Sequence, residues 1–155
     1  MARNAKRRLP TDFPPSRVTF LTADLSKPDF SLPASVYSKV LSATTQVIHN
    51  AWPIDFNRTL QSFQTSLDGV QNLISFAAKA NLSPSIFFLS SISSVINYRN
   101  TSNAEALIPE AAITVLSRAA PMGYEESKYL AERMLDSAAH KLHLNAGTAR
   151  IGQIA

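Results

Sequence analysis

Short apolar runs alternate with longer amphipathic stretches along most of the chain. Four of the short runs favour extended structure and predict strands, at residues 18–21, 46–49, 85–89 and 148–151. Three longer stretches predict helices, at residues 34–43, 57–80 and 122–142; in the last two of them, apolar residues recur at steps of three and four. A further short helical piece is expected within 110–118. Strands that alternate with helices indicate an α/β fold built on a parallel sheet.

The ends of the predicted strands indicate where a ligand would bind. Residues 86–89 are all apolar, as expected for a strand that helices cover on both faces of a parallel sheet. In such sheets, ligands bind beyond the carboxyl ends of the strands. The residues to examine are therefore those that follow the strands, namely Asp24, Asn50, Ser90 to Ser94 and Gly152.

The first 16 residues differ from the rest in being basic and Pro-rich, and we expect a tail there, ahead of a domain at residues 17–155. Residues 1–17 hold five basic side chains and one acidic one. They account for the net charge of +4, because the other ten basic and ten acidic residues cancel. A basic tail can bind nucleic acid or a membrane surface. No aromatic platform or nucleic-acid-binding motif accompanies this one, so we expect a solvated tail and no nucleic-acid partner.

The residue types exclude several classes of chemistry. The chain has no cysteine, which excludes disulfides, thiolate metal sites and cysteine nucleophiles. This fits a reducing compartment, and we expect a cytoplasmic protein. No run of 18 apolar residues occurs, so no membrane span is expected. The His, Asp and Glu residues lack metal-ligand spacing, so no metal site is expected, and His49 is interpreted as structural.

Tyr124 and Lys128 form a Tyr-x-x-x-Lys pair near the start of the predicted helix at 122–142. The spacing of four places both side chains on one helix face, one turn apart. A free tyrosine has a pKa of about 10, and a nearby ammonium favours the phenolate and lowers that pKa. Such a pair can pass a proton to or from a carbonyl oxygen while a hydride moves at carbon. The alternative is an ordinary surface helix whose lysine stem lies along the surface.

A hydroxyl cluster, Ser90-Ser91-Ile92-Ser93-Ser94, follows the predicted strand at 85–89. A serine in this place could donate a hydrogen bond to the substrate oxygen and hold the tyrosine in position. Taken alone, the cluster is more simply a polar loop that caps a strand. A serine cluster followed about 30 residues later by Tyr-x-x-x-Lys is a much rarer combination.

That combination resembles the extended short-chain dehydrogenase/reductase superfamily. Four segments sharpen the resemblance, with the sequences HNAWPIDFN at 49–57, GVQNLI at 69–74, PMGYEESKY at 121–129 and RIGQIA at 150–155. They are similar to the thioester reductase domains that end nonribosomal-peptide-synthetase-like enzymes, especially fungal ones. Carboxylic acid reductases and the reductase of aminoadipate metabolism share this domain. The likeness covers about residues 17–155, and it implies a partial Rossmann-like parallel sheet with helices on both faces.

The resemblance assigns a role to each residue of the predicted catalytic group. It makes Tyr124 the catalytic acid and Lys128 its partner, which would also bond the ribose of the nicotinamide. Ser91 is the first candidate for the third hydroxyl, and Ser93 is the second. The implied cofactor is NADPH, and the implied substrate is an acyl thioester on the phosphopantetheine arm of a carrier protein, reduced to an aldehyde or an alcohol.

Three further residues are implied in cofactor binding. Asp24 would lie near the adenine, and Asn50 with Ala51 would lie beneath the cofactor. Judged from the residues alone, Asp24 is equally well a turn residue and Asn50 equally well a strand-end cap.

One family feature has no counterpart in this sequence. Members begin with a strand, a Gly-x-x-Gly-x-x-Gly turn and a helix, which bind the pyrophosphate on backbone N–H groups. The four glycines do not form that pattern; they are Gly69, Gly123, Gly147 and Gly152. We therefore expect the first β-α-β unit and the C-terminal substrate-binding part to be missing. The strand at 46–49 would then keep an open edge suited to self-association.

Two classes of function follow. In the first, the chain is a piece of an NADPH-dependent thioester reductase, and another extended short-chain reductase or epimerase is the alternative within enzymes. In the second, it is a non-enzymatic truncated product that pairs with other proteins through its open edge. We expect negligible reductase activity from the chain alone. NADPH oxidation with an acyl thioester above the rate without protein would contradict this.

Overall fold

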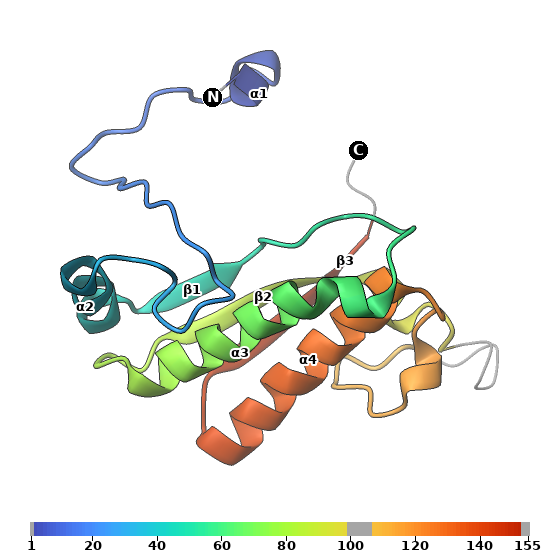
Figure 1. Cartoon of the computed structure of the whole chain (residues 1–155). Helices are drawn as coiled ribbons and strands as arrows, with labels where there is room; N and C mark the ends of the chain where they lie inside the picture. Colours follow the sequence, from blue (N-terminus) through green and yellow to red (C-terminus); the bar gives the residue numbers. More distant parts are fainter. Residues whose placement is uncertain (1, 99–106, 153–155) are drawn as a thin grey trace.

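Three parallel strands form the sheet in the computed structural model, which describes residues 2–98 and 107–152. The strands are β1 (Gln46–His49), β2 (Ser85–Ser91) and β3 (Ala146–Ile151), in the order β1-β2-β3 (Figure 1). Val47 pairs with Ile86, and Phe88 pairs with Thr148. The predicted α/β fold with a parallel sheet is thus confirmed. All three carboxyl ends lie at one edge of the sheet, which makes that edge the place for a site.

The helices match the predicted ones with small differences at their ends. The described helical elements are α1 (Ala2–Lys6), α2 (Ala34–Ala43), α3 (Gln64–Lys79), α4 (Gly123–Leu142) and the short 3-10 turns η1 (Leu60–Phe63), η2 (Ile92–Val95) and η3 (Leu116–Arg118). The helix expected at 57–80 begins later, with η1 leading into α3. The piece expected at 110–118 is reduced to the three residues of η3. None of the described helices has the length and apolarity to cross a membrane.

The core lies between the sheet and the helices α3 and α4. Alternate residues of β2 point into it, and they pack with the apolar stripes of both helices. The buried cluster consists of Val70, Ile74, Ala77, Ile86, Phe88, Ala131, Leu135 and Ala138. A second cluster packs α2 and Phe30 against the other side of α3, around Phe76. The first cluster fixes α4 over β2, and this places the start of α4 beside the carboxyl end of β2.

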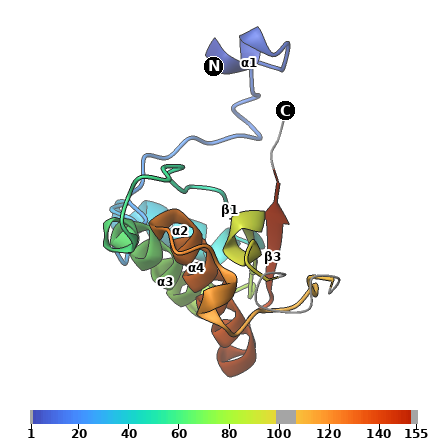
Figure 2. The ribbon, with the colours of Figure 1, turned by 90° about the vertical axis from the view of Figure 1, so that its right-hand side faces the viewer.

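The opposite face of the sheet is not covered by any described helix. Ile48 is 65% exposed and Phe87 is 40% exposed, because strand residues alternate between the two faces. Figure 2 shows α3 and α4 together on one side of the strands. The expectation of helices on both faces therefore holds for one face only in the described residues. The outer edge of β1 has no described strand beside it, and self-association through that edge stays a prediction.

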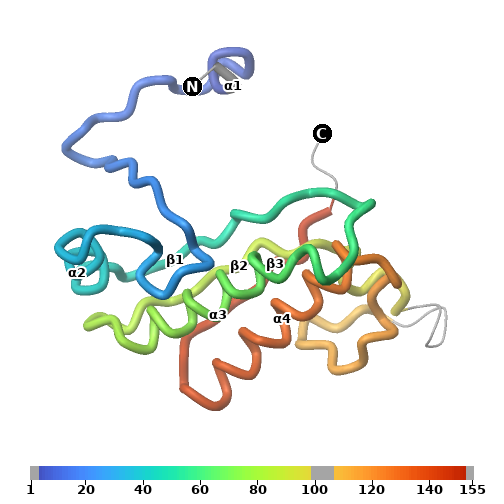
Figure 3. Tube along the Cα trace, viewed as in Figure 1, coloured from blue at the N-terminus to red at the C-terminus, as the bar shows by residue number. Residues whose placement is uncertain are grey.

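The predicted strand at 18–21 is wrong. These residues form no strand, and Phe20 is 73% exposed. A strand needs a neighbour for its backbone N–H and C=O groups, and no described segment pairs with this one. The chain from α1 to this point runs as an extended path outside the core (Figure 3). It joins the fold at Leu25, whose carbonyl accepts a hydrogen bond of 2.9 Å from the Asn72 side chain on α3.

Candidate active site

The structure brings Ser91, Tyr124 and Lys128 to one place. Ser91 ends β2, and Tyr124 lies in the first turn of α4, which passes over that end of the sheet. The Ser91 hydroxyl lies near enough to the Tyr124 side chain to lower the pKa of that phenol. The Lys128 ammonium lies 5.9 Å from the centre of the Tyr124 ring. Residues 33 positions apart in sequence therefore form one polar group at the carboxyl edge of the sheet.

The serine cluster divides into two pairs with different partners. Ser90 and Ser94 both donate to the Glu132 carboxylate, at 2.5 and 2.7 Å. Ser93 donates to Ser91 Oγ through its backbone N–H at 3.2 Å and through its hydroxyl at 2.8 Å. Because Ser91 Oγ accepts both of these bonds, its own hydrogen is left for another acceptor. This arrangement favours Ser91 over Ser93 as the hydroxyl that faces Tyr124.

Tyr124 is a neutral phenol in this environment. Burial raises its pKa, the hydrogen bond with Ser91 opposes the rise, and the charge of Glu125 adds to it. The rings of Phe56 and Phe63 contact Tyr124 edge-on, at 5.0 and 6.1 Å between centres. The sequence predicted a lowered pKa for Tyr124, and the structure reverses the direction because burial outweighs the hydrogen bond with Ser91. A phenol that keeps its proton at neutral pH is suited to act as an acid.

Lys128 is buried, with 3% of its surface exposed. Its Nζ donates a 2.7 Å hydrogen bond to the backbone carbonyl of Leu89 on β2. Burial lowers the pKa of Lys128 to about 8, and the charge of Glu132 opposes the fall. The ammonium is therefore directed at the sheet. With a pKa of about 8, it is only slightly favoured over the neutral amine just above neutral pH.

Two residues near the site were not identified as functional from the sequence. Trp52 follows β1 and lies with its ring 4.7 Å from Lys128 Nζ. His49 is 4% exposed, its Nε2 has no hydrogen-bond partner, and it stacks on Phe88 at 5.5 Å. Burial lowers the pKa of His49 to about 4, with a smaller contribution from Lys128. His49 is thus uncharged at neutral pH, and its interpretation as structural stays a prediction.

The residues expected to bind the cofactor lie in two different settings. Asn50 and Ala51 are exposed, directly after β1 at the carboxyl edge of the sheet. Asp24 caps a turn, because its Oδ1 accepts hydrogen bonds from the N–H and the hydroxyl of Ser26, at 3.0 and 2.7 Å. Those two bonds lower the pKa of the Asp24 carboxyl. The turn explains Asp24 without a ligand, so its role at the adenine stays a prediction.

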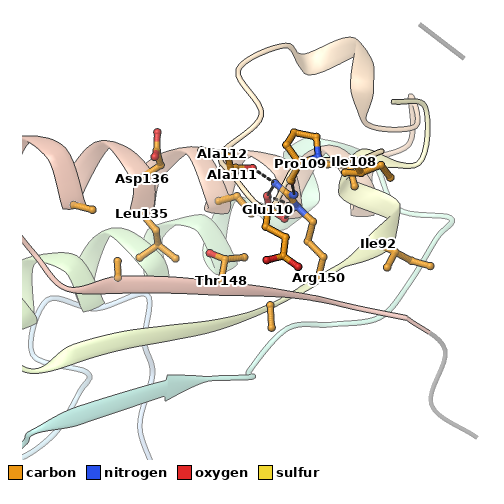
Figure 4. A pocket seen from close by; sticks show the side chains of 15 residues that line it. Ile92, Ile108, Pro109, Glu110, Ala111, Ala112, Leu135, Asp136, Thr148 and Arg150 are labelled. Carbon is orange, nitrogen blue, oxygen red and sulfur yellow. Dashed lines mark hydrogen bonds and ion pairs between the residues drawn. The ribbon is translucent and has the colours of Figure 1, made fainter. Parts of the chain in front are cut away.

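The buried carboxylate of Glu132 holds the serine cluster in place next to the site. Besides the two serines, Glu132 accepts hydrogen bonds from Arg150 on β3, from Nε at 3.0 Å and from Nη2 at 2.8 Å. Arg150 also donates to the carbonyls of Pro109 and Ala111 (Figure 4). This network borders a cavity of about 700 Å³, and none of the three predicted catalytic residues lines that cavity. The network joins β2, η2, β3 and α4.

The described residues fit one end of a nicotinamide cofactor better than the other. A hydroxyl, a phenol and an ammonium lie together at the sheet edge, and these groups suit a carbonyl substrate and a ribose. Three of the four glycines, Gly69, Gly123 and Gly147, are explained by close packing. A Cβ on Gly69 would lie 3.2 Å from Leu25 Cβ, and one on Gly147 would lie 3.3 Å from the Phe87 ring. The pyrophosphate end thus has no matching cradle among the described residues.

The sequence was compared with families of known proteins. It matches the model of the Male sterility protein family over residues 3–155. The chain belongs to the Male sterility protein family. This is a family of NAD(P)-dependent reductase domains, so the sequence-based resemblance is confirmed at the level of family and cofactor class.

Three relatives of the chain come from fungi and are much longer than it. A carboxylic acid reductase of Neurospora crassa is 38% identical over 154 residues, which is 99% of this chain and 14% of the relative. An adenylate-forming reductase of Aspergillus terreus is 34% identical over 90% of this chain and 14% of its own length. A non-reducing polyketide synthase of Aspergillus niger is 36% identical over 90% of this chain and 6% of its own length. The chain thus spans a small part of these proteins.

The chain has the fold of part of a known reductase domain. The terminal R domain from the myxalamid PKS-NRPS biosynthetic pathway superposes with a TM-score of 0.70 at 18% identity. The match covers 86% of this chain and 33% of that domain. The likeness confirms the partial Rossmann-like fold.

Proposed function

We propose that this chain carries the catalytic residues of an NADPH-dependent thioester reductase. The substrate would be an acyl thioester on the phosphopantetheine arm of a carrier protein, reduced to an aldehyde or onward to an alcohol. One observation carries the proposal: Ser91, Tyr124 and Lys128 meet at the carboxyl edge of a parallel sheet. The names of the relatives, a carboxylic acid reductase and a polyketide synthase, support this substrate class.

The three side chains divide the proton chemistry between them. When bound, the reduced nicotinamide supplies the hydride to the carbonyl carbon of the thioester. Tyr124 donates its phenolic proton to the carbonyl oxygen as the charge develops there, which gives a thiohemiacetal. The aldehyde forms when the C–S bond of that thiohemiacetal breaks and the hydroxyl proton leaves with the phosphopantetheine thiol. Ser91 donates a hydrogen bond to the same oxygen, because Ser93 fills its acceptor sites. The Lys128 ammonium stabilises the phenolate that remains on Tyr124.

The nicotinamide end of the cofactor is expected to supply most of the affinity. We expect reduced nicotinamide mononucleotide to bind the purified chain within about threefold of NADPH, a difference of ~0.7 kcal/mol. The reason is that the described glycines form no pyrophosphate cradle. The measurement is a titration of the chain with each compound, followed by nicotinamide fluorescence.

The control for this titration is the double variant Tyr124→Phe, Lys128→Ala. We expect it to bind both compounds much more weakly, because it lacks the phenolic hydroxyl and the ammonium. If neither compound binds the folded wild-type chain, or if the double variant binds equally well, the proposed site is wrong. Binding of NADPH far tighter than that of the mononucleotide would mean that other residues hold the phosphates.

A further inference from the structure

The Lys128 ammonium lies among aromatic rings. Its Nζ is 4.6 Å from the centre of the Phe88 ring and 4.7 Å from the centre of the Trp52 ring. The Tyr124 ring is farther away, at 5.9 Å. Faces of aromatic rings attract a cation and also keep water away from it. Phe88 and Tyr124 come from β2 and α4, whereas Trp52 comes from the loop after β1.

Trp52 is fixed to the helix turn that carries the proposed catalytic pair. Its indole Nε1–H donates a 3.2 Å hydrogen bond to Ser127 Oγ. Ser127 is fully buried, and its hydroxyl donates a 2.6 Å bond to the Tyr124 carbonyl. The other side of the indole stacks on Phe63, with 6.4 Å between the ring centres and an angle of 14° between the planes. The indole is therefore held at its polar edge and on its face.

We propose that Trp52 is the positioning residue for Lys128, and that its ring closes the space in which the ammonium is directed at the Leu89 carbonyl. The proposal rests on the proposed function for the role of Lys128, but its geometry is independent of any substrate. Trp52 also follows the exposed pair Asn50-Ala51 directly. It thus connects the segment expected beneath the cofactor with the helix that supplies the proton.

The charged and titratable groups around Lys128 are few. His49 faces it from β1, and Tyr124 and Glu132 face it from α4, with Glu132 itself paired to Arg150. On β2, the Leu89 carbonyl accepts a hydrogen bond from Lys128 Nζ. The pKa of Lys128, about 8, is set mainly by burial. Removal of the indole would admit water and move that pKa toward its ordinary value of about 10.4.

Trp52 itself reports on this contact, because it is the one tryptophan of the chain. We expect the indole fluorescence of the wild-type chain to change in two steps with pH. The lower step, at about pH 4, follows His49, whose ring centre is 6.0 Å from that of Trp52. The upper step, at about pH 8, follows Lys128. A Lys128→Met variant should lose the upper step and keep the lower one.

Substitution of Trp52 tests its effect on the lysine directly. The probe is the full chain with ¹³Cε-labelled lysine, followed by NMR from pH 6 to 11, with the Lys128 signal identified by its loss in Lys128→Met. We expect Trp52→Leu to raise the Lys128 midpoint to about 9 or above, because the water it admits outweighs the lost attraction between the ring and the cation, and Trp52→Phe to restore the midpoint to within about 0.5 of the wild type. Phe76→Leu, in the second core cluster, is the matched control and should leave the midpoint unchanged.

Three results would overturn the proposal. They are an upper fluorescence step that persists in Lys128→Met, a Lys128 midpoint that Trp52→Leu leaves at the wild-type value, and an equal rise in Phe76→Leu. If Trp52→Leu does not fold, the wild-type and Lys128→Met fluorescence titrations decide alone. None of these measurements needs cofactor or substrate. A failure to bind NADPH would therefore count against the proposed function and leave the role of Trp52 to these tests.

Discussion

Replacement of Gly123 by alanine is expected to destabilise the fold by about 3 kcal/mol, at the upper end of the usual cost of overpacking. Gly123 is the first residue of α4 and is buried against the segment that leads into η1. A Cβ at this position would lie 2.3 Å from the Arg58 carbonyl oxygen and 2.4 Å from the Leu60 nitrogen. Both atoms are backbone, so the segment would have to move as a whole. The better helix propensity of alanine, worth at most ~1 kcal/mol, cannot offset this.

Urea unfolding followed by circular dichroism measures this loss, and Gly152→Ala is the matched control. Among the described residues, a Cβ on Gly152 would meet only the Ile92 side chain, at an ordinary 3.9 Å. That variant should stay within about 0.5 kcal/mol of the wild type. We expect the melting temperature of Gly123→Ala to fall by roughly 6–12 °C. If both variants unfold alike, the segment before η1 does not press on α4 as described.

The same displacement would reach the catalytic residues. Phe56 and Phe63 flank the segment that touches Gly123, and their rings contact Tyr124. When these rings move away, Tyr124 becomes more hydrated and its raised pKa falls back toward the ordinary value. A glycine directly before the tyrosine of Tyr-x-x-x-Lys is thus explained by the close passage of residues 58–60 over the start of the helix.

Local sequence patterns predicted most helices and strands well. The predictions failed where an element depends on pairing with a distant segment of the chain. The helix at 34–43 and the strand at 46–49 were predicted with the bounds that the structure shows, because periodicity and strand propensity are read within a few residues. The run at 18–21 has the same propensity but no described neighbour, and a strand is stable only in a sheet. The sequence also did not predict that one face of the sheet lacks a helix among the described residues, since an apolar strand does not reveal which of its faces is covered.

In the candidate site, too, the sequence revealed local relations between residues but not the long-range contacts. Tyr124 and Lys128 could be found from the sequence because their relation is one helical turn. The choice between Ser91 and Ser93 depends on which hydroxyl donates to the other, and only the structure orients them. Trp52 lay within a recognised segment, yet its contact is with Ser127, 75 residues away. The pKa of Tyr124 was predicted in the wrong direction because burial is a property of the whole fold.

Replacement of Glu132 by alanine is expected to cost about 3–5 kcal/mol, because it leaves a guanidinium and two hydroxyls without their buried partner. The Glu132 side chain is 5% exposed and that of Arg150 is 17% exposed. The carboxylate accepts from Ser90, Ser94 and Arg150, and water cannot easily replace it there. Chemical denaturation of the variant measures the loss.

The control for Glu132→Ala lies one turn along the same helix. Asp136 pairs with Arg133 at 2.7 Å, but the two side chains are 25% and 32% exposed. Asp136→Ala should cost no more than about 0.5 kcal/mol, because exposed ion pairs contribute little. Equal losses in the two variants would show that Glu132 is solvated and does not hold the network together.

A double substitution, Glu132→Met with Arg150→Met, separates the loss of the ion pair from the cost of leaving the Arg150 charge buried without a partner. It should recover a large part of the stability lost in Glu132→Ala, since a buried ion pair replaced by apolar side chains is often neutral. Ser90 and Ser94 would still lack the carboxylate that accepts their hydrogen bonds, so we expect the loop that holds Ser91 to be displaced in the double variant. We therefore expect the double variant to be folded and yet to bind reduced nicotinamide mononucleotide more weakly than the wild type. Wild-type affinity in that variant would mean that Ser91 is positioned without Glu132.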